Sequence, residues 1–378
     1  MKRLAFKYRF YPNDVQKDIL NKTFGCSRLV YNKALSLRTD SWYKENIRIK
    51  PKDVSSQLTK WKKEEGFSFL NEVSSVPLQQ SLRHLDSAFN RFFKKQASYP
   101  TFKKRNGIQS ATFTRNALKF DLKNKELILP KEIGKLKIRW SRPLKHQPST
   151  VTVSKDCSDR YFVSFSFEKA IIAKEKISKK IGIDLGIKDL IITSDEEKIT
   201  NNKYLKKHEE RLTFLQKDLS RKVKGSRNRN KARLKVTKKH AKISDSRRDH
   251  LHKMTSKLIN ENQVIAIESL EVSSMLKNKR LAKNISDSGW YELKRMLQYK
   301  SDWYGRELVE INQYYPSSKR CNNCGYILPY LDLKQRLWEC PKCNQMHDRD
   351  INAAKNIKEA GLALLACGDG VRPKLRMQ

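Results

Sequence analysis

Four of the seven cysteines stand in two CxxC pairs, Cys321/Cys324 and Cys340/Cys343, which are separated by fifteen residues. Each pair lets two thiolates reach one ion from a tight turn, and the segment between the pairs can bring them together as a hairpin. Four thiolates close a tetrahedral site and leave no position for a substrate, so we expect a structural Zn²⁺ here. His347 lies nearby in the sequence. Because four cysteines already fill the site, we do not expect it to be a ligand.

Three carboxylates stand where the end of a strand or the start of a helix would expose them. Asp184 lies inside KKIGIDLGIKDLIITSD, which we interpret as a strand, a turn and a second strand. Glu268 ends the apolar strand in VIAIESL, and Asp350 lies in DRDINAAKNI, which continues as a helix. A charge among apolar strand residues is costly unless it binds something. An acid at a helix start also has a purely structural use, because it can cap free N–H groups. We interpret Asp348 as such a cap, or as an acid that lies next to the metal ligands without binding the ion.

Taken together, Asp184, Glu268 and Asp350 predict a catalytic magnesium site. Carboxylate oxygens are the ligands that Mg²⁺ prefers. Three acids at two strand ends and one helix start could hold two ions about 3.5–4 Å apart, an arrangement that activates water for phosphodiester hydrolysis. Each acid alone remains compatible with a structural role, and the pattern formed by all three carries the hypothesis.

The charge of the chain points to a polyanionic partner. Its 378 residues hold 81 Lys+Arg against 40 Asp+Glu, a net charge of +41, and nucleic acid is the polyanion we expect. An anionic membrane is the alternative, but no apolar run approaches the roughly 18 residues of a spanning helix. The start, MKRLAFKYRFYPND, lacks the apolar stretch of a signal peptide, which fits a reducing cytoplasm. We also expect a prokaryotic cell and association with the nucleoid. In that setting we expect the lone cysteines, Cys26, Cys157 and Cys367, to be buried free thiols.

The spacing of apolar residues changes three times along the N-terminal part of the chain. Alternation in AFKYRFY predicts a strand, and from Asn13 the apolar spacing becomes helical. After a break around Pro51, apolar residues recur at helical spacing up to Phe93, with basic residues between them. Residues 110–168 are predicted to be β structure, most clearly in VTVSKDCSDRYFVSFSFE. This order predicts a β domain with a helical insertion, followed by a linker over 168–180.

Residues 203–257 are the most basic part of the chain. They hold 20 Lys/Arg and 5 Asp/Glu, a net charge of +15. Leucines keep a helical period, GSRNRN interrupts it, and the period resumes at Leu234. We therefore expect a basic helical hairpin. A solvated face is the simplest use of such a run, but contact with nucleic acid explains this density of charge better.

The motifs met so far resemble those of one family. GIDLGIKDL, the IES strand, YYPSSKRCNNCG, ECPKC and HDRDINAAKNI occur in this order in the TnpB family, and the resemblance extends from RFYPNDVQ to GDGVRP. These proteins are encoded by insertion sequences, have long been described as OrfB transposases and are related to type V CRISPR effectors. The resemblance implies an RNA-guided DNA endonuclease with a RuvC-type, ribonuclease H-like nuclease domain. It gives the catalytic role to Asp184, Glu268 and Asp350.

The resemblance also implies a multidomain α+β architecture. The zinc ribbon is expected to stabilise the nuclease domain and to position the helix that carries Asp350. The implied parts are a wedge β-barrel formed by 1–10 and 107–177, a helical recognition lobe at 11–106, a RuvC-like core at 178–312 that includes the basic hairpin, a zinc ribbon at 313–346, the last RuvC helix at 347–367 and a tail at 368–378.

The partners implied by the resemblance are a guide RNA from the end of the element and double-stranded target DNA. Guide pairing would supply the sequence specificity, while the protein reads a short adjacent motif and the backbone. Gln79 and Thr114 match positions near the motif-reading surface of relatives. Pro51 and Ser75 depart from the Tyr and Lys of a relative, which leaves the motif preference open.

Three other functions remain as alternatives. IGIDLG also resembles the first phosphate loop of sugar kinases and heat-shock ATPases, but we find no second Gly-rich loop after residue 186. A nucleic-acid-binding transposase accessory or regulator that does not cut would need only the ribbon and the basic helices. A transposase that joins strands would use the same metal chemistry as a nuclease.

Overall fold

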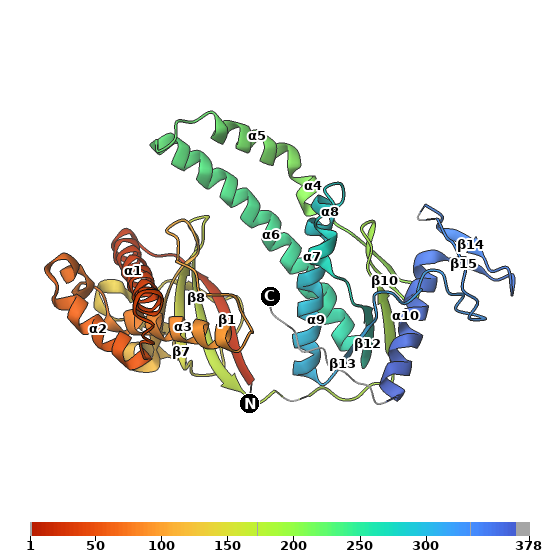
Figure 1. The fold of residues 1–378 in the computed structure, drawn as a ribbon, viewed down its shortest axis with the longest axis horizontal. Coiled ribbons are helices and arrows are strands. Elements are labelled where there is room, and N and C mark those ends of the chain that lie inside the picture. The colour runs from red at the N-terminus through yellow and green to blue at the C-terminus, as the bar shows by residue number, and fades with distance from the viewer. Residues whose placement is uncertain (1, 172, 333, 368–378) are drawn as a thin grey trace. The chain divides into compact units, whose positions relative to one another are not determined.

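The computed structural model describes residues 2–171, 173–332 and 334–367 (Figure 1). The chain divides into two compact units, one up to Ala170 and one from Ile171 onward. The predicted tail at 368–378 lies outside the described residues. None of the helices in the described part is long and apolar enough to cross a membrane.

The first unit is built on a five-stranded sheet whose first strand comes before a block of helices. Strand β1 (Lys2–Phe10) pairs antiparallel along its whole length with β8, as expected from its alternating side chains. The strand order is β2-β7-β8-β1-β6, so α1, α2 and α3 are an insertion between β1 and β2. The other strands of this sheet are β2 (Gln109–Thr114), β6 (Ile138–Arg139), β7 (Thr150–Lys155) and β8 (Tyr161–Lys169).

A second, three-stranded sheet completes the β structure of this unit. It has the order β3-β4-β5 and comprises β3 (Lys119–Asp121), β4 (Glu126–Leu129) and β5 (Gly134–Lys135). Among the described strands no ladder joins β2 to β6, so the recorded pairings leave the five-stranded sheet open. The barrel that the resemblance implies stays a prediction.

The inserted helices begin where the sequence predicts. Asn13 caps α1 (Asp14–Glu45) in a reciprocal capping box with Gln16, so the change of period at Asn13 is confirmed. Pro51, which we interpreted as a break, is the first residue of α2 (Pro51–Lys63), because its fixed φ and missing N–H suit the first helical position. A 3₁₀ turn (Glu65–Asn71) leads to α3 (Ser75–Phe93), and the apolar faces of the helices form one core.

The second unit contains a mixed sheet of order β11-β10-β9-β12-β13. The predicted strand–turn–strand of 179–195 is confirmed, because β9 and β10 pair antiparallel. Strand β12 pairs parallel with both β9 and β13. The strands are β9 (Lys180–Asp184), β10 (Asp189–Thr193), β11 (Lys198–Thr200), β12 (Val264–Glu268) and β13 (Glu307–Ile311).

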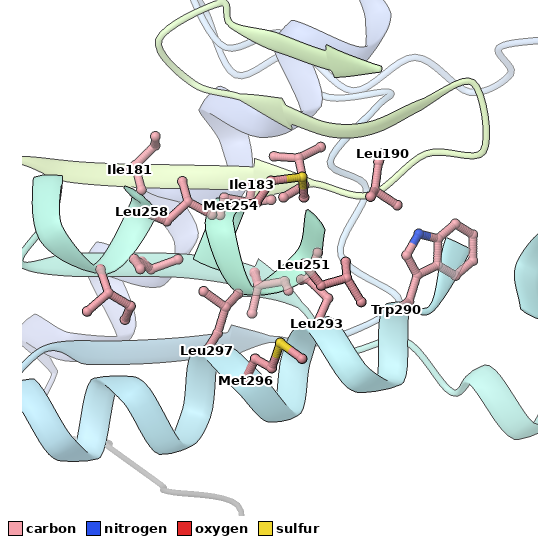
Figure 2. Packing of buried hydrophobic residues seen from close by; sticks show 14 of the residues in the cluster. Ile181, Ile183, Leu190, Leu251, Met254, Leu258, Trp290, Leu293, Met296 and Leu297 are labelled. Atoms are coloured by element: carbon pink, nitrogen blue, oxygen red, sulfur yellow. The ribbon is translucent and has the colours of Figure 1, made fainter. Parts of the chain in front are cut away.

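One face of this sheet is packed against helices α6 (Arg227–Glu261) and α9 (Trp290–Tyr304) (Figure 2). Buried residues of β9 and β12 contact apolar residues of both helices, and Trp290 closes one end of the cluster. The strands are almost wholly apolar because they are buried on both faces. Two short helices, α7 (Val272–Met275) and α8 (Ala282–Ser288), lie between β12 and α9 in the chain.

The basic hairpin is confirmed, with one correction. It consists of α4 (Tyr204–Lys207), α5 (Glu209–Ser220) and α6 (Arg227–Glu261), and α5 and α6 bury a small apolar cluster between them. We expected GSRNRN to interrupt the helical period as far as Leu234, but α6 already begins at Arg227. The reason is local: the side chain of Ser226 caps α6 by accepting from the backbone N–H of Arg229. The guanidinium of Arg229 in turn donates to the carbonyl of Leu219 in the last turn of α5 and to that of Lys222 just beyond it.

Helix α10 (Arg349–Ala366) covers the other face of the sheet, and a small hairpin precedes it. The hairpin pairs β14 (Leu337–Glu339) with β15 (Met346–Asp348) in the register Leu337 opposite Asp348. Since α10 starts directly after β15, the hairpin and the helix share one continuous backbone at this point.

Candidate active site and metal centre

Two of the three predicted acids meet at one edge of the sheet because their strands run in parallel. Asp184 is the last residue of β9, and Glu268 is the last residue of β12. Ile183 lies opposite Ile267 in the parallel ladder, so the next residue of each strand emerges at the same edge. Asp184 and Glu268 are far apart in the sequence, and the parallel pairing of β9 with β12 brings them together.

Close packing of α10 on the sheet brings the third acid to the same place. A Cβ added to Gly182 would lie 2.2 Å from the carbonyl oxygen of Ala354, and one added to Gly361 would lie 2.5 Å from the Cβ of Ala266. No side chain larger than hydrogen fits at either contact. The helix therefore lies directly on β9 and β12, and Asp350 in its first turn approaches Asp184.

The electrostatics of the site reflect this crowding of acids. Burial, followed by the negative charge of Asp350, raises the pKa of Asp184 to about 6. Burial, followed by the charge of Asp184, raises the pKa of Glu268 to about 7. A site that makes two carboxyl groups hard to ionise is one in which a cation would be favourable.

The acids next to α10 have cationic and backbone partners. Asp350 pairs with Arg336, whose Nη1 lies 3.0 Å from each of the two carboxylate oxygens. Asp348 is the N-cap of α10 and accepts from the backbone N–H groups of Asp350 and Ile351, so its interpretation as a cap is confirmed. An ion pair between Asp348 and Lys198 further lowers the pKa of Asp348, which burial alone would raise.

The four cysteines of the CxxC pairs form a compact cluster. Within the described residues they are the group whose ligand atoms all lie within 4.8 Å of one another; the three acids are not drawn together that closely. The Sγ atoms of Cys321 and Cys343 are 3.7 Å apart, and those of Cys324 and Cys340 are 3.5 Å apart. Zn–S bonds of about 2.3 Å in a tetrahedron would place sulfurs roughly 3.8 Å apart, so the four thiols fit such an ion.

Two polar side chains support the cluster from outside. The amide of Asn323 donates to Cys343 at 3.6 Å, and this contact is the main reason that the pKa of the Cys343 thiol falls to about 6. His347 lies with its Nε2 atom 3.0 Å from the Sγ of Cys321, and its ring packs against Trp338. We retain the expectation that the four cysteines are the ligands, with His347 as a neighbour of one sulfur.

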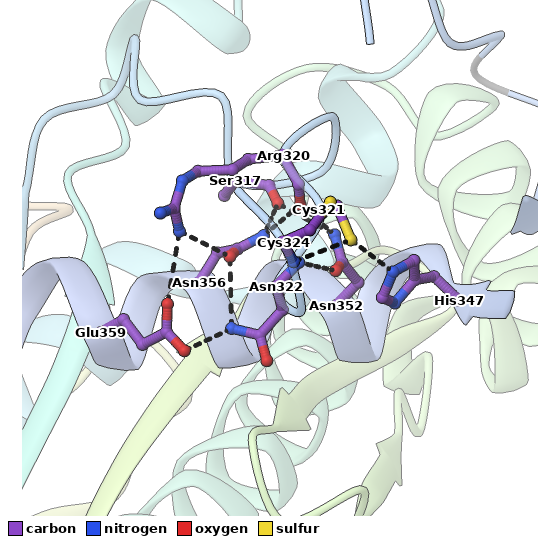
Figure 3. A network of polar contacts seen from close by, with 9 residues as sticks. All are labelled: Ser317, Arg320, Cys321, Asn322, Cys324, His347, Asn352, Asn356 and Glu359. Carbon is purple, nitrogen blue, oxygen red and sulfur yellow. Dashed lines mark hydrogen bonds and ion pairs between the residues drawn. The ribbon is translucent and has the colours of Figure 1, made fainter. Parts of the chain in front are cut away.

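A buried polar network fastens the cysteine cluster to the helix of Asp350 (Figure 3). Asn352 donates to the carbonyl of Arg320 at 2.8 Å and accepts from the backbone N–H of Asn322 at 3.0 Å. Asn356, one turn further along α10, donates to the carbonyls of Ser317 and Arg320 at 2.8 and 2.6 Å. Both asparagine side chains are almost wholly buried, so these bonds form away from water.

Sequence reasoning missed Asn352, Asn356 and Arg336. The two asparagines had a usable signal: they stand at i and i+4 in NAAKN, on one face of α10, in a helix whose neighbouring residues are mostly apolar. A polar residue on a buried helical face must find partners. Arg336 had no comparable signal, because only the hairpin register brings it to Asp350.

The predicted motif-reading residues both belong to the first unit. Gln79 is exposed on α3 and lines a hollow of about 470 Å³ together with Arg38, Lys52 and Arg83. Thr114 ends β2, opposite Thr150 of β7. Both assignments remain predictions.

The expectation that the lone cysteines are buried is wrong for two of them. Cys26 is buried in the helical core, but Cys157 and Cys367 are exposed. Cys157 lies in the turn between β7 and β8, and Cys367 is the C-cap of α10. Turns and helix ends lie at the surface, where a small side chain has no core to enter.

Three family models match parts of this chain. Family models match residues 143–279, described as a probable transposase, and residues 290–357, described as a Cas12f1-like TNB domain. A third model, described as a helix-turn-helix domain, matches residues 1–47. The described residues of that range form one strand, β1, and one long helix, α1, rather than a pair of helices.

Two curated relatives match almost the whole chain. A protein of Streptomyces pristinaespiralis named "Putative RNA-guided DNA endonuclease" is 52% identical over 98% of this chain and 92% of its own length. A protein of Escherichia coli K12 named "Putative RNA-guided DNA endonuclease InsQ" is 34% identical over 98% of this chain and 96% of its own length.

Two solved structures share the fold at low sequence identity. The structure titled as a Cas12f1–sgRNA–target DNA complex aligns with a TM-score of 0.59 at 15% identity, covering 94% of this chain and 98% of that one. A mini-RNA-guided endonuclease, CRISPR-Cas_phi3, aligns with a TM-score of 0.57 at 9% identity, covering 96% of this chain and 92% of that one. By fold, the chain is thus a mixed α/β protein of the type found in compact Cas12 effectors. At the level of sequence it belongs to the TnpB family, as the nearly full-length relatives show.

Proposed function

We propose that this protein is an RNA-guided DNA endonuclease whose metal-dependent hydrolytic site is formed by Asp184, Glu268 and Asp350. The main observation is that two parallel strands end in acids at one edge of the sheet, while α10 brings a third acid to the same place. The names of the two nearly full-length relatives support the same function.

The three carboxylates fit divalent ions by their chemistry. They are hard oxygen ligands. Burial, followed by the charge of a neighbouring acid, raises the pKa values of Asp184 and Glu268, and a bound cation would reverse this effect. When bound, two Mg²⁺ ions would supply an activated water and stabilise the leaving oxygen. The residues of the chain then have separable tasks: Asp184 and Glu268 bind from the rigid sheet, and Asp350 binds from the helix.

The four-cysteine cluster fits a structural Zn²⁺, because the sulfurs stand at nearly tetrahedral spacing and four thiolates leave no open position. We propose that this ion stabilises the ribbon, and that the ribbon in turn fixes the first turn of α10 through Asn352 and Asn356. In this arrangement zinc contributes to catalysis only through the position of Asp350.

The proposed partners are a guide RNA from the end of the element and double-stranded DNA beside a short motif. The net charge of +41 supports polyanion binding, and the exposed lysines and arginines of α6 offer one basic surface. We assign the first unit to the wedge and recognition lobe, with Gln79 and Thr114 as candidate motif-reading residues. The second unit is assigned to a RuvC-like nuclease domain with its ribbon.

The test is plasmid cleavage by the protein co-expressed with RNA from the flanking sequence, on a target beside a randomised motif with Mg²⁺ present. Asp184→Ala and Glu268→Ala should abolish cleavage and leave RNA and target binding largely intact, because only metal ligation is lost. Cutting by either variant at the wild-type rate would refute the site. Bound RNA without any cutting by the wild type would favour the alternative of a non-cleaving transposase accessory or regulator.

A further inference from the structure

Arg336 contacts the carboxylate of Asp350 at the position that a bound metal ion would occupy. A single nitrogen, Nη1, lies 3.0 Å from Oδ1 and 3.0 Å from Oδ2. This location between the two oxygens is where a divalent ion bound to both of them would also lie. One positive group therefore occupies the face of Asp350 that a metal would need.

The hairpin holds Arg336 in this place. Its register puts Leu337 opposite Asp348, and the pairing continues by one step, because the backbone N–H of Arg349 donates to the carbonyl of Arg336 at 2.8 Å. The residue after Arg349 is Asp350, so the backbone of Arg336 is tied one residue away from the acid that its side chain contacts. The contact thus follows from the ribbon's β-ladder.

Exposure shows that the pair can open. The Arg336 side chain is 58% exposed and that of Asp350 is 22% exposed, so the guanidinium can turn into solvent while the carboxylate stays in place. An arginine cannot lose its proton to make way for an ion, and so it must move. The energy that holds an exposed ion pair is small, which suits a contact that exchanges.

We propose that Arg336 is the counter-cation of Asp350 in the ion-free site and that it must leave Asp350 before a divalent ion can bind there. This proposal rests on the proposed function, since it takes Asp350 to be a metal ligand. In this role Arg336 does not bind the ion; it competes with the ion for Asp350 and so sets the ion concentration at which the site fills.

The role makes a specific prediction about ion affinity. Removing the guanidinium removes both a competitor and a nearby positive charge, so Arg336→Gln should lower the Mn²⁺ concentration at half-saturation by about two- to tenfold. Arg336→Lys keeps the charge on a long side chain and should stay within about twofold of the wild type. The matched control is Lys342→Gln, which removes one positive charge from an exposed position of the same ribbon.

Mn²⁺ binding to the full-length, zinc-loaded protein should be measured without nucleic acid, from the free-ion signal in electron paramagnetic resonance at fixed ionic strength. Melting curves and zinc content establish that each variant is folded. Tighter binding by Arg336→Gln, with Lys342→Gln unchanged, would support the exchange. Equal or weaker binding by Arg336→Gln would overturn it.

Two further variants separate this inference from the proposed function. If Asp350→Asn and Asp184→Asn weaken Mn²⁺ binding while Arg336→Gln leaves it unchanged, the metal site stands and only the role of Arg336 falls. If both acid variants bind Mn²⁺ like the wild type, the ion lies elsewhere, and the proposed function fails together with the inference.

Discussion

The backbone N–H of Asn322, inside the first CxxC turn, donates to the side chain of Asn352 on α10 at 3.0 Å. Asn352 lies two residues beyond Asp350, so one hydrogen bond joins the first turn of the cysteine cluster to the helical turn that carries a proposed catalytic acid. The amide of Asn322 also donates to Glu359 at 2.7 Å, which ties the same turn to α10 further along the helix (Figure 3). The cysteine cluster and the carboxylate site are thereby connected through hydrogen bonds.

Removing one zinc ligand should destabilise the protein. Cys324→Ser leaves three thiolates in the cluster, and because metal binding contributes folding free energy, we expect a lower melting temperature and loss of bound zinc. Calorimetry combined with metal analysis measures both quantities. Cys157→Ser is the control, since Cys157 is exposed and outside the cluster. A Cys324→Ser protein with full zinc content and an unchanged melting curve would contradict the assignment.

Asn352→Ala should weaken the link itself without touching any metal ligand. It removes the acceptor for the N–H of Asn322 and the donor to the carbonyl of Arg320 at a buried position, at a cost of roughly 1–3 kcal/mol of unfolding free energy. Urea denaturation measures this cost. Lys355→Ala, on the same helix, breaks only an ion pair with Glu196 between partly exposed side chains and should cost less than about 1 kcal/mol. Equal effects of the two variants would argue against the network.

The raised pKa of Asp184 predicts how stability depends on pH in the absence of divalent ions. An acid with a pKa of about 6 when folded and 3.8 when unfolded holds its proton more tightly in the folded state. The free energy of unfolding contributed by this group therefore falls as pH rises from about 4 to about 6 and is level above that range.

Comparing the wild type with Asp184→Asn measures this contribution together with the effect of the Asp184 charge on Glu268, which has the same sign. Between pH 4 and pH 7 the difference in unfolding free energy should shift in favour of the variant, by on the order of 2 kcal/mol. Saturating Mg²⁺ should remove most of that shift, because the ion stabilises the ionised acid in the wild type alone. Urea denaturation across this pH range tests the sign, and a shift in favour of the wild type as pH rises would refute it.

Much of this arrangement could be predicted from the sequence. The strands that end in Asp184 and Glu268, the cap at Asp348 and the spacing of the cysteines are local patterns, and the structure contains each of them. The ion pair between Arg336 and Asp350 depends on the register of the β14–β15 hairpin, which cannot be read from a local sequence pattern. The exposure of Cys157 shows the same limit, because average burial of a residue type does not say which turn it occupies.

Packing at Gly182 offers the sharpest test of how α10 places Asp350. In Gly182→Ala the new Cβ would lie 2.2 Å from the carbonyl oxygen of Ala354 and 2.6 Å from the backbone nitrogen of Lys358. Both atoms belong to the helix backbone and cannot turn aside, so α10 must shift away from β9. We expect a loss of about 1–3 kcal/mol in unfolding free energy and weaker Mn²⁺ binding.

Gly25→Ala is the matched control for this substitution. Gly25 lies inside α1, and nothing stands within 4 Å of its added Cβ. Alanine has the higher helix propensity, so the same change should raise the unfolding free energy there by up to about 1 kcal/mol and leave Mn²⁺ binding unchanged. Opposite signs at the two glycines, measured by urea denaturation, would show that close contact at β9 sets the position of the helix. A stabilising effect at Gly182 would instead mean that α10 stands further from the sheet, and that Asp350 reaches Asp184 by another route.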